Sequence, residues 1–124
     1  MKKLKQRLSP LAKKQLRELR AFHKTLFGKY KADQIYSSIK ECIEALGDFP
    51  DLGYVEPSLV DYPQCFRTFL QHPNLKIVYW VEDGIVKIAM FFDTRQQPYK
   101  LRHTIEHGSD WVCEEIEPYG LTNL

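Results

Sequence analysis

The sequence predicts an α+β domain in which a two-helix hairpin covers one face of a small antiparallel sheet. Three observations lead to this fold class. Apolar residues recur every three or four positions through residues 10–46, which is the spacing of amphipathic helices. Three runs rich in β-branched and aromatic residues follow at 65–70, 75–82 and 85–93. The chain has 124 residues, the size of one domain with one core.

The first third of the chain is expected to form a strand and two helices. Residues 4–8 indicate a short, mostly polar first strand that joins one edge of the sheet. Ser9 followed by Pro10 predicts a helix start, because Ser caps the first turn and Pro fits the first helical position. This helix is expected to end at Gly28, and a second helix is expected from about residue 32 to residue 46.

Asp83-Gly84 predicts a two-residue hairpin turn between the last two strands. The turn pairs Glu82 with Ile85 and thereby sets the register of both strands. On the face that the helices cover, this register pairs Val81 with Val86, Tyr79 with Ile88, Ile77 with Met90, and Leu75 with Phe92. The other face is expected to be open and to show a basic and aromatic set of residues: Arg67, Phe69, Lys76, Val78, Trp80, Lys87, Ala89 and Phe91.

Charge is strongly segregated along the chain although the formal net charge is only +2. Residues 1–31 contain eleven Lys or Arg and one acid, whereas residues 104–124 contain five acids and no Lys or Arg. A chain of this kind can carry a basic surface for nucleic acid or for an acidic partner, and the simpler alternative is a solvated helix face. We divide the chain into a folded domain at 1–103, which ends within a short helix stopped by Gly108, and an acidic tail at 104–124.

Several classes of protein and site are disfavoured. Apolar runs are too short to span a membrane, and the first residues lack a secretory signal, so we expect a cytoplasmic protein with no membrane partner. The three cysteines lack metal-ligand spacing. Residues 103–107 read H-x-x-E-H, an inverted zinc-peptidase pattern, but Gly108 ends the helix that such a site needs. We therefore expect no metal and no cofactor.

The predicted open face is the candidate site. Lys and Arg can hold phosphates and aromatic rings can stack on bases, so this face could bind nucleic acid. Cations can also stabilise the transition state of RNA cleavage without a metal while a base activates the 2′-hydroxyl. The alternative is an ordinary solvated sheet face.

The order of several short motifs resembles the RelE/ParE toxin superfamily over about residues 3–102. No single motif is specific, and the resemblance rests on their order and spacing. In chain order they are Ser9-Pro10-Leu11-Ala12, Phe27-Gly28, Ala32, "LGDFPDLG" at 46–53, "FRTFL" at 66–70, "KIVYWVEDGIVKI" at 76–88 and "FDTRQQP" at 92–98.

The resemblance implies the toxin of a type II toxin-antitoxin module, which a cognate antitoxin neutralises and which meets operator DNA only through that antitoxin. RelE-like toxins cut mRNA on the ribosome with a Lys/Arg cluster and sometimes a Tyr, whereas ParE-like toxins inhibit DNA gyrase. Matched position by position, the resemblance implies Arg67, Lys76, Arg95 and Tyr99 as the site residues. Phe69 departs from the RelE pattern, which has a second basic residue there.

Three functions follow from the resemblance, and the first is favoured. Arg95-Gln96-Gln97-Pro98 and the "DFPDLG" loop are more similar to the ParE side, which implies action on DNA gyrase. The alternative is a metal-independent, ribosome-dependent mRNA endoribonuclease, the one reading in which the protein is an enzyme. A further alternative is a non-toxic module that only binds its partner.

Overall fold

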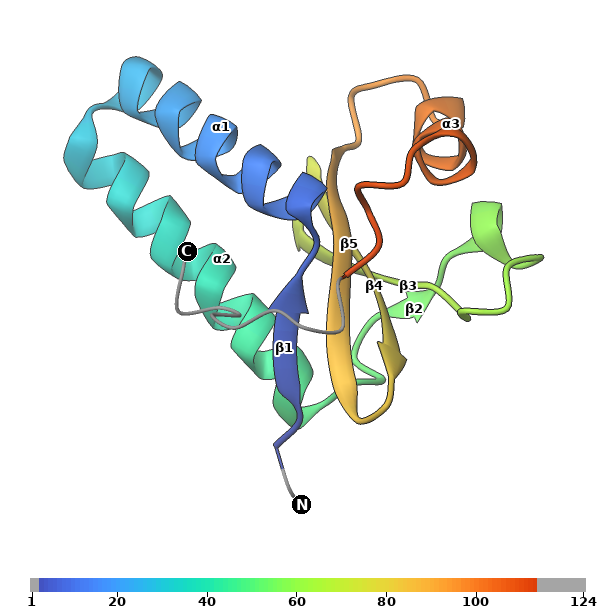
Figure 1. Ribbon diagram of the computed structural model, residues 1–124. Helices are drawn as coiled ribbons and strands as arrows, with labels where there is room; N and C mark the ends of the chain where they lie inside the picture. The colour runs from blue at the N-terminus through green and yellow to red at the C-terminus, as the bar shows by residue number, and fades with distance from the viewer. Residues whose placement is uncertain (1–2, 114–124) are drawn as a thin grey trace.

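The computed structural model describes residues 3–113 and contains three α-helices and a five-stranded sheet in that range. The strands are β1 (Lys5–Leu8), β2 (Tyr54–Val55), β3 (Arg67–His72), β4 (Leu75–Glu82) and β5 (Ile85–Asp93), and they lie in the order β1-β5-β4-β3-β2 (Figure 1). The α+β fold class is confirmed. The sheet is mixed rather than wholly antiparallel, because β1 runs parallel to β5. The long helical connection after β1 makes such a parallel pair possible.

Helices α1 (Pro10–Phe27) and α2 (Lys29–Asp48) form the predicted hairpin. The Ser9 hydroxyl accepts a hydrogen bond from the Ala12 amide at 2.9 Å and donates one to the Ala89 carbonyl at 2.7 Å, so the cap also ties α1 to β5. Helix α2 begins three residues earlier than expected, because Gly28 alone joins the helices with a φ of 86°. Figure 1 shows that the far end of the hairpin extends beyond the sheet.

The hairpin packs on one face of the sheet and forms the first core. Its buried members come from β1, both helices, β4 and β5: Leu8, Ala12, Leu16, Ile39, Ile43, Leu46, Ile77, Tyr79, Val86, Ile88 and Phe91. The predicted hairpin turn is present, with positive φ at both Asp83 and Gly84. The pairing of Val81 with Val86 and of Tyr79 with Ile88 is confirmed. This part of the sheet therefore follows the sequence pattern closely.

Beyond Tyr79 the predicted register is wrong by one residue. A β-bulge in β5 at Ala89 makes Val78 oppose Met90 and Ile77 oppose Phe91. One extra residue moves every later side chain of that strand to the other face, so Phe91 lies under the helices. The assignment of faces in β3 is also reversed, because Arg67 opposes Tyr79 and Phe69 opposes Ile77 on the helix-covered face.

The face that we expected to be open is closed by a second core. Helix α3 (Tyr99–His107) and the segment after it cover this face (Figure 1). The buried members are Leu59, Phe66, Val78, Trp80, Ala89, Met90, Phe92, Leu101, Ile105, Trp111 and Cys113. The expectation failed because Lys76 and Lys87 flank these apolar residues and suggested solvent contact. Lys87 is itself buried, with its ammonium 2.8 Å from Glu82.

Helix α3 ends at His107 before Gly108, as predicted. A domain boundary at residue 103 would fall inside α3, and Ile105, Trp111 and Cys113 pack in the second core. Residues 114–124 of the predicted acidic tail lie outside the described residues. Within residues 3–113, no helix is both long and apolar enough to cross a membrane.

Candidate functional site

Arg67 lies on the helix-covered side of the sheet, where it holds the loop between α2 and β2. Its guanidinium donates to the Gly53 carbonyl at 2.6 Å and lies 3.6 Å from the Asp51 carboxylate. The buried Tyr79 hydroxyl holds the same loop, since it donates to the Pro50 carbonyl at 2.8 Å and accepts from the Gly53 amide at 2.9 Å. Burial raises the pKa of this hydroxyl. Arg67 is therefore an anchor of the loop in this fold.

Gly53 is required where it stands because the loop approaches β3 closely. A Cβ atom added to Gly53 would lie 2.6 Å from the Thr68 carbonyl oxygen and 2.8 Å from the Tyr79 hydroxyl. Both contacts are shorter than side chains tolerate, so the backbone of the "DFPDLG" loop can dock only with glycine here.

Lys76 lies on the opposite face, beside a buried carboxylate. Glu56, at the start of the 3₁₀ turn η1 (Pro57–Leu59), accepts hydrogen bonds from the Thr68 hydroxyl at 2.7 Å and from the Ser58 amide at 3.1 Å. The Lys76 ammonium is 3.4 Å from the same carboxylate. Burial alone would raise the pKa of Glu56, but these hydrogen bonds and Lys76 together hold it below its ordinary value. Lys76 therefore neutralises an internal anion.

Arg95 and Tyr99 share one exposed corner after the end of β5. The Arg95 guanidinium forms a two-pronged contact with the Asp93 carboxylate at 3.0 and 2.7 Å, yet 68% of its side chain is exposed. Tyr99 begins α3 and is 64% exposed. Beside Tyr99 is an open pocket of about 310 Å³ between α1, β5 and α3, lined in part by Gln15, Phe91 and His103. Of the four predicted residues, these two have mostly exposed side chains.

The predicted placement of Arg67 and Lys76 on one open face is wrong. Arg67 pairs with Tyr79 on one face of the sheet, and Lys76 pairs with Leu70 on the other. The error follows from the β3 assignment, because reversing the faces of one strand separates residues that were expected to be neighbours. Whether each of these residues serves toxicity stays a prediction.

Comparison with known proteins identifies the family. The sequence profile described as "ParE toxin of type II toxin-antitoxin system, parDE" matches residues 7–98, which is most of the chain. The chain belongs to the ParE toxin family. A solved structure titled "Chromosomal ParDE TA system from P. aeruginosa" has the same fold, with a TM-score of 0.61 and 18% sequence identity over 73% of this chain and 95% of that one. None of the curated proteins compared with the chain matches it.

This ParE-family chain is accordingly a type II toxin, and its partner is a cognate antitoxin. The matched residues stop at the position before α3, so α3 and the contacts that hold it lie beyond the family match.

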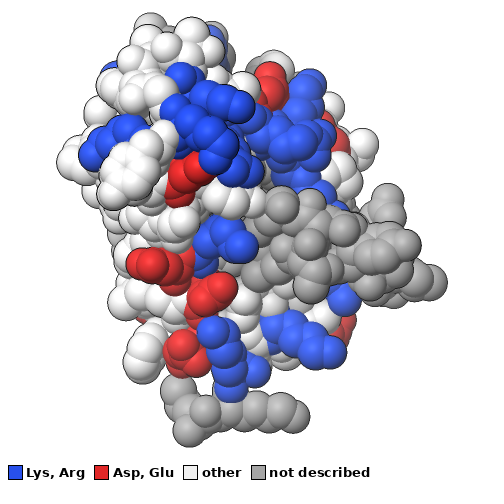
Figure 2. Space-filling model, turned by 90° about the vertical axis from the view of Figure 1, so that its left-hand side faces the viewer, with Lys and Arg blue, Asp and Glu red and all other residues white. Residues whose placement is uncertain are grey.

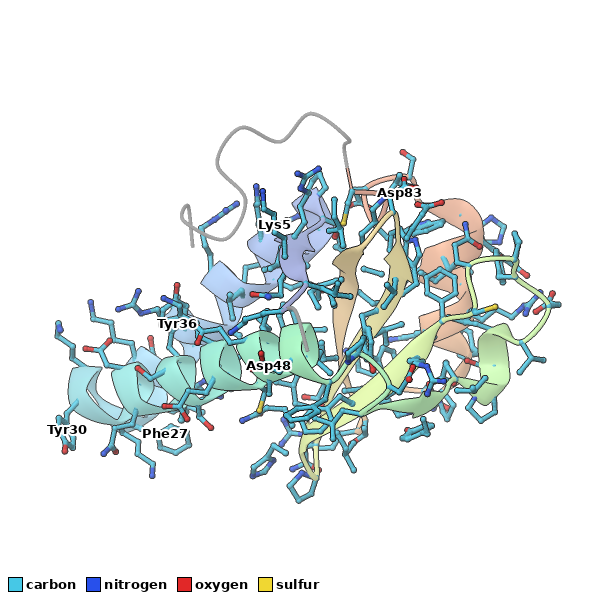
Figure 3. All side chains as sticks on the ribbon, turned by 90° about the horizontal axis from the view of Figure 1, so that it is seen from below. Lys5, Phe27, Tyr30, Tyr36, Asp48 and Asp83 are labelled. Atoms are coloured by element: carbon cyan, nitrogen blue, oxygen red, sulfur yellow. The ribbon has the colours of Figure 1, made fainter. Side chains whose placement is uncertain are left out.

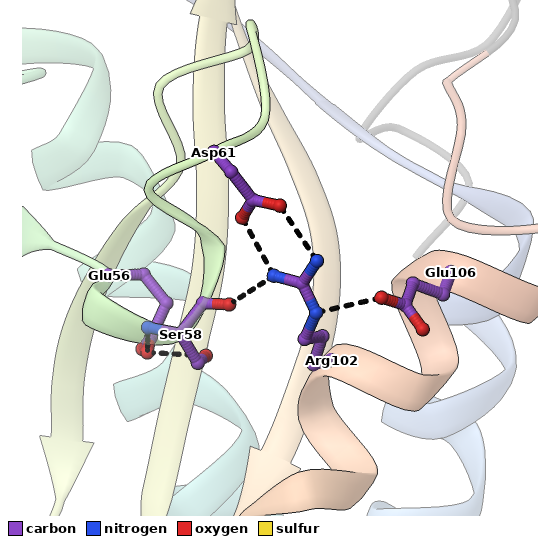
Figure 4. Close-up of polar contacts among 5 residues, drawn as sticks. All are labelled: Glu56, Ser58, Asp61, Arg102 and Glu106. Carbon is purple, nitrogen blue, oxygen red and sulfur yellow. Dashed lines mark hydrogen bonds and ion pairs between the residues drawn. The ribbon is translucent and has the colours of Figure 1, made fainter.

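A cluster around Arg102 was not predicted (Figure 4). Its guanidinium forms two bonds of 2.7 Å with the Asp61 carboxylate, donates to the Ser58 carbonyl at 2.9 Å, and donates to Glu106 at 2.7 Å. The hydrogen bonds from Arg102 lower the pKa of Asp61 to about 2. This clamp joins α3 to the η1 segment. The spacing of Arg102 and Glu106 is visible in the sequence, but nothing in it points to Asp61.

The H-x-x-E-H segment is part of α3 and Glu106 is engaged by Arg102. The rings of His103 and His107 lie 4.4 Å apart on the outside of the helix. Over residues 3–113, no group of three or more His, Cys, Asp and Glu side chains is placed to hold a metal ion.

Proposed function

We propose that this ParE-family toxin stops growth by acting on DNA gyrase. The observation that carries the proposal is the separation of Arg67 and Lys76 across the sheet, each with its own acidic neighbour. Metal-free RNA cleavage needs several cations and a base around one phosphate, and these two cations cannot reach the same phosphate. The separation favours a toxin that binds a protein target over one that cuts mRNA.

The exposed corner of Arg95 and Tyr99 is the proposed contact with the target. Both side chains are accessible, and Arg and Tyr are the residue types that contribute most to protein interfaces. Asp93 holds the guanidinium in a fixed orientation, so little conformational entropy is lost when a carboxylate or carbonyl of the target replaces solvent.

The test is induction of the chain in growing cells without its antitoxin. Arrest with continued methionine incorporation, a DNA-damage response and gyrase-linked breaks is the expected result. Rapid loss of incorporation with mRNA cleavage on ribosomes would replace the proposal by the endoribonuclease function. Normal growth with abundant folded protein would leave the non-toxic binding module.

The site is tested by Arg95→Ala, with Lys31→Ala as the matched control. Lys31 is also exposed, carries the same charge and does not line the pocket beside Tyr99, so both variants change the net charge equally. We expect Arg95→Ala to restore growth and Lys31→Ala to remain toxic. Equal toxicity of the two variants, at equal protein levels, would remove Arg95 from the site.

A further inference from the structure

Four cations form a stripe along one face of α1. Lys13, Arg17, Arg20 and Lys24 are separated by four, three and four residues, which places them on the same side of the helix. At a rise of about 1.5 Å per residue the stripe is about 16 Å long. Glu18, the one acid in residues 1–31, lies on a neighbouring face of α1. The stripe is therefore a continuous row of positive charge.

Beside the stripe is a groove of about 400 Å³ between α1 and α2. Its lining includes Arg17, Arg20 and Lys24 from α1, together with Lys29 and Asp33 from α2. Among the residues that the structure describes, Asp33 is the one carboxylate in this lining, and it is shared by Arg20 and Lys29 at 2.8 Å each. Those two hydrogen bonds lower the pKa of Asp33 to about 2, so it stays ionised and the groove keeps a surplus of positive charge.

Tyr36 extends the basic surface onto α2. The Arg20 guanidinium lies 4.4 Å from the centre of its ring, and the Lys40 ammonium lies 5.8 Å from the same ring. These contacts hold both cations against the Tyr36 ring, next to the groove residue Arg20. In Figure 2, Lys and Arg side chains gather in the upper part of the face shown, where the helical hairpin lies.

Helix stability alone does not account for this stripe. Like charges four residues apart on a helix repel, and Lys13 with Arg17 and Arg20 with Lys24 are two such pairs. The buried residues of α1 are Ala12 and Leu16, so the cations also contribute nothing to the first core. The row gives this side of α1 a positive potential that attracts an anionic ligand.

We propose that the stripe and its groove bind the phosphate backbone of duplex DNA. Duplex DNA carries about one negative charge per 1.7 Å of its axis, so the stripe spans the length occupied by about nine charges. Contacts of Lys and Arg with phosphates carry no sequence information, so we expect binding that is independent of sequence. The role of this contact in cells rests on the proposed action on gyrase, an enzyme that works on DNA.

The placement of apolar residues favours DNA over an acidic protein segment. A protein partner is expected to use apolar anchors beside Arg and Tyr, but Phe22 and Leu26 lie about 200° around α1 from Lys24, on the side away from the groove. Figure 3 shows Phe27 and Tyr30 at the far end of the hairpin, with Tyr36 directed to the side opposite Phe27. The basic groove and the exposed apolar end of the hairpin are therefore separate surfaces.

The test measures binding of a short, fluorescein-labelled DNA duplex of random sequence to the full chain by anisotropy at several salt concentrations. A plot of the logarithm of the binding constant against the logarithm of the salt concentration should be linear. Four phosphate contacts predict a slope of about −3.6. Arg17→Ala/Lys24→Ala removes two contacts, so the slope should become shallower by about 1.8 units and binding at low salt should weaken at least about tenfold.

Lys31→Ala/Lys100→Ala is the matched control, because it removes two exposed cations that do not line the groove. Its slope and affinity should equal those of the unmodified chain, and circular dichroism should show all variants folded. The proposal fails if the duplex does not bind, if both double variants weaken binding equally, or if single-stranded RNA of the same length binds more tightly. Equal competition by poly-glutamate at matched charge would assign the surface to an acidic polypeptide instead.

Failure of this proposal can be told apart from failure of the gyrase proposal. Gyrase poisoning that survives Arg17→Ala/Lys24→Ala, together with no duplex binding, would overturn only the DNA contact. Salt-dependent duplex binding lost in that variant would support the DNA contact even if induced cells showed mRNA cleavage and no gyrase-linked breaks.

Discussion

The face of the sheet under the helical hairpin is closed almost entirely by apolar side chains, whereas the opposite face also encloses Glu56, Thr68 and Lys87. On the first face, burial follows the alternation of strands and the three-to-four spacing of helices. On the second face, Lys76 and Lys87 are tolerated because Glu56 and Glu82 neutralise them. The difference teaches that a lysine in a strand does not mark an open face when a carboxylate lies within reach of its ammonium.

The largest expected effect tests whether the second face is a true core. Trp80→Ala should lower the free energy of unfolding by about 3 to 5 kcal/mol, because Trp80 is 3% exposed and packs edge-on against Phe66 and Trp111. Ile43→Ala in the first core is the reference, with an expected loss of about 2 to 5 kcal/mol. Urea unfolding measures both. A loss below about 1 kcal/mol for Trp80→Ala would mean that this face is open in solution.

The second prediction concerns the buried carboxylate that distinguishes the two faces. Glu56→Gln should cost about 3 kcal/mol, because the Lys76 ammonium loses its counter-ion and the Thr68 hydroxyl loses a charged acceptor. Lys76→Met should cost less in the Glu56→Gln background than in the unmodified chain. A double-mutant cycle measured by urea unfolding gives this coupling, and additive losses would show that the pair is not coupled.

Sequence reasoning succeeded where local signals are strong. Ser9-Pro10 sets the start of α1, and Asp83-Gly84 sets the register as far as Tyr79 and Ile88. It failed at Ala89, because nothing about an alanine marks a bulge, and one extra residue exchanges the faces of the strand beyond it.

The predicted placement of Arg67 beside Lys76 failed for a related reason. Placing Arg67 beside Lys76 required the register of β3, which no tight turn specifies, and the structure puts these residues on opposite faces. The contacts that hold them come from Gly53 and Glu56, in a loop whose path leaves no periodic pattern. Arg95 and Tyr99 are exposed after the end of β5, and their role stays a prediction.

The third prediction concerns the Tyr79 hydroxyl, which holds a loop on the helix-covered face. Tyr79→Phe keeps the ring in the first core but removes the hydroxyl that binds Pro50 and Gly53, leaving the Gly53 amide without its acceptor. We expect a loss of about 1 to 2 kcal/mol and faster amide exchange in residues 49–53. Exchange measured by mass spectrometry separates this local effect from global unfolding. Unchanged exchange in the loop would show that Arg67 alone anchors it.

The smallest effect is lost in acid and concerns the contacts of Arg102 with Asp61 that hold α3 on the second face. Arg102 lowers the pKa of Asp61 from 3.8 to about 2, so the stabilisation from this pair is fully present above about pH 4 and is lost as the pH falls toward 2. Asp61→Asn should therefore be less stable than the unmodified chain at neutral pH, and the gap should close between pH 4 and pH 2. Thermal unfolding across this range measures the gap. The Trp111 indole, which donates to the Ile105 and Gly108 carbonyls at 2.9 Å each, reports locally on the end of α3 by NMR.

Asp51→Asn is the control for this last prediction, because Asp51 is 90% exposed and only one contact of 3.6 Å joins it to Arg67. Loss of so loose a surface pair should change stability little at any pH. A gap for Asp61→Asn that stays constant from pH 7 to pH 2 would mean that the Asp61 carboxylate does not hold α3 through its charge. The attachment of α3 would then depend on the hydrogen bond from Arg102 to the Ser58 carbonyl and on the packing of Leu101 and Ile105.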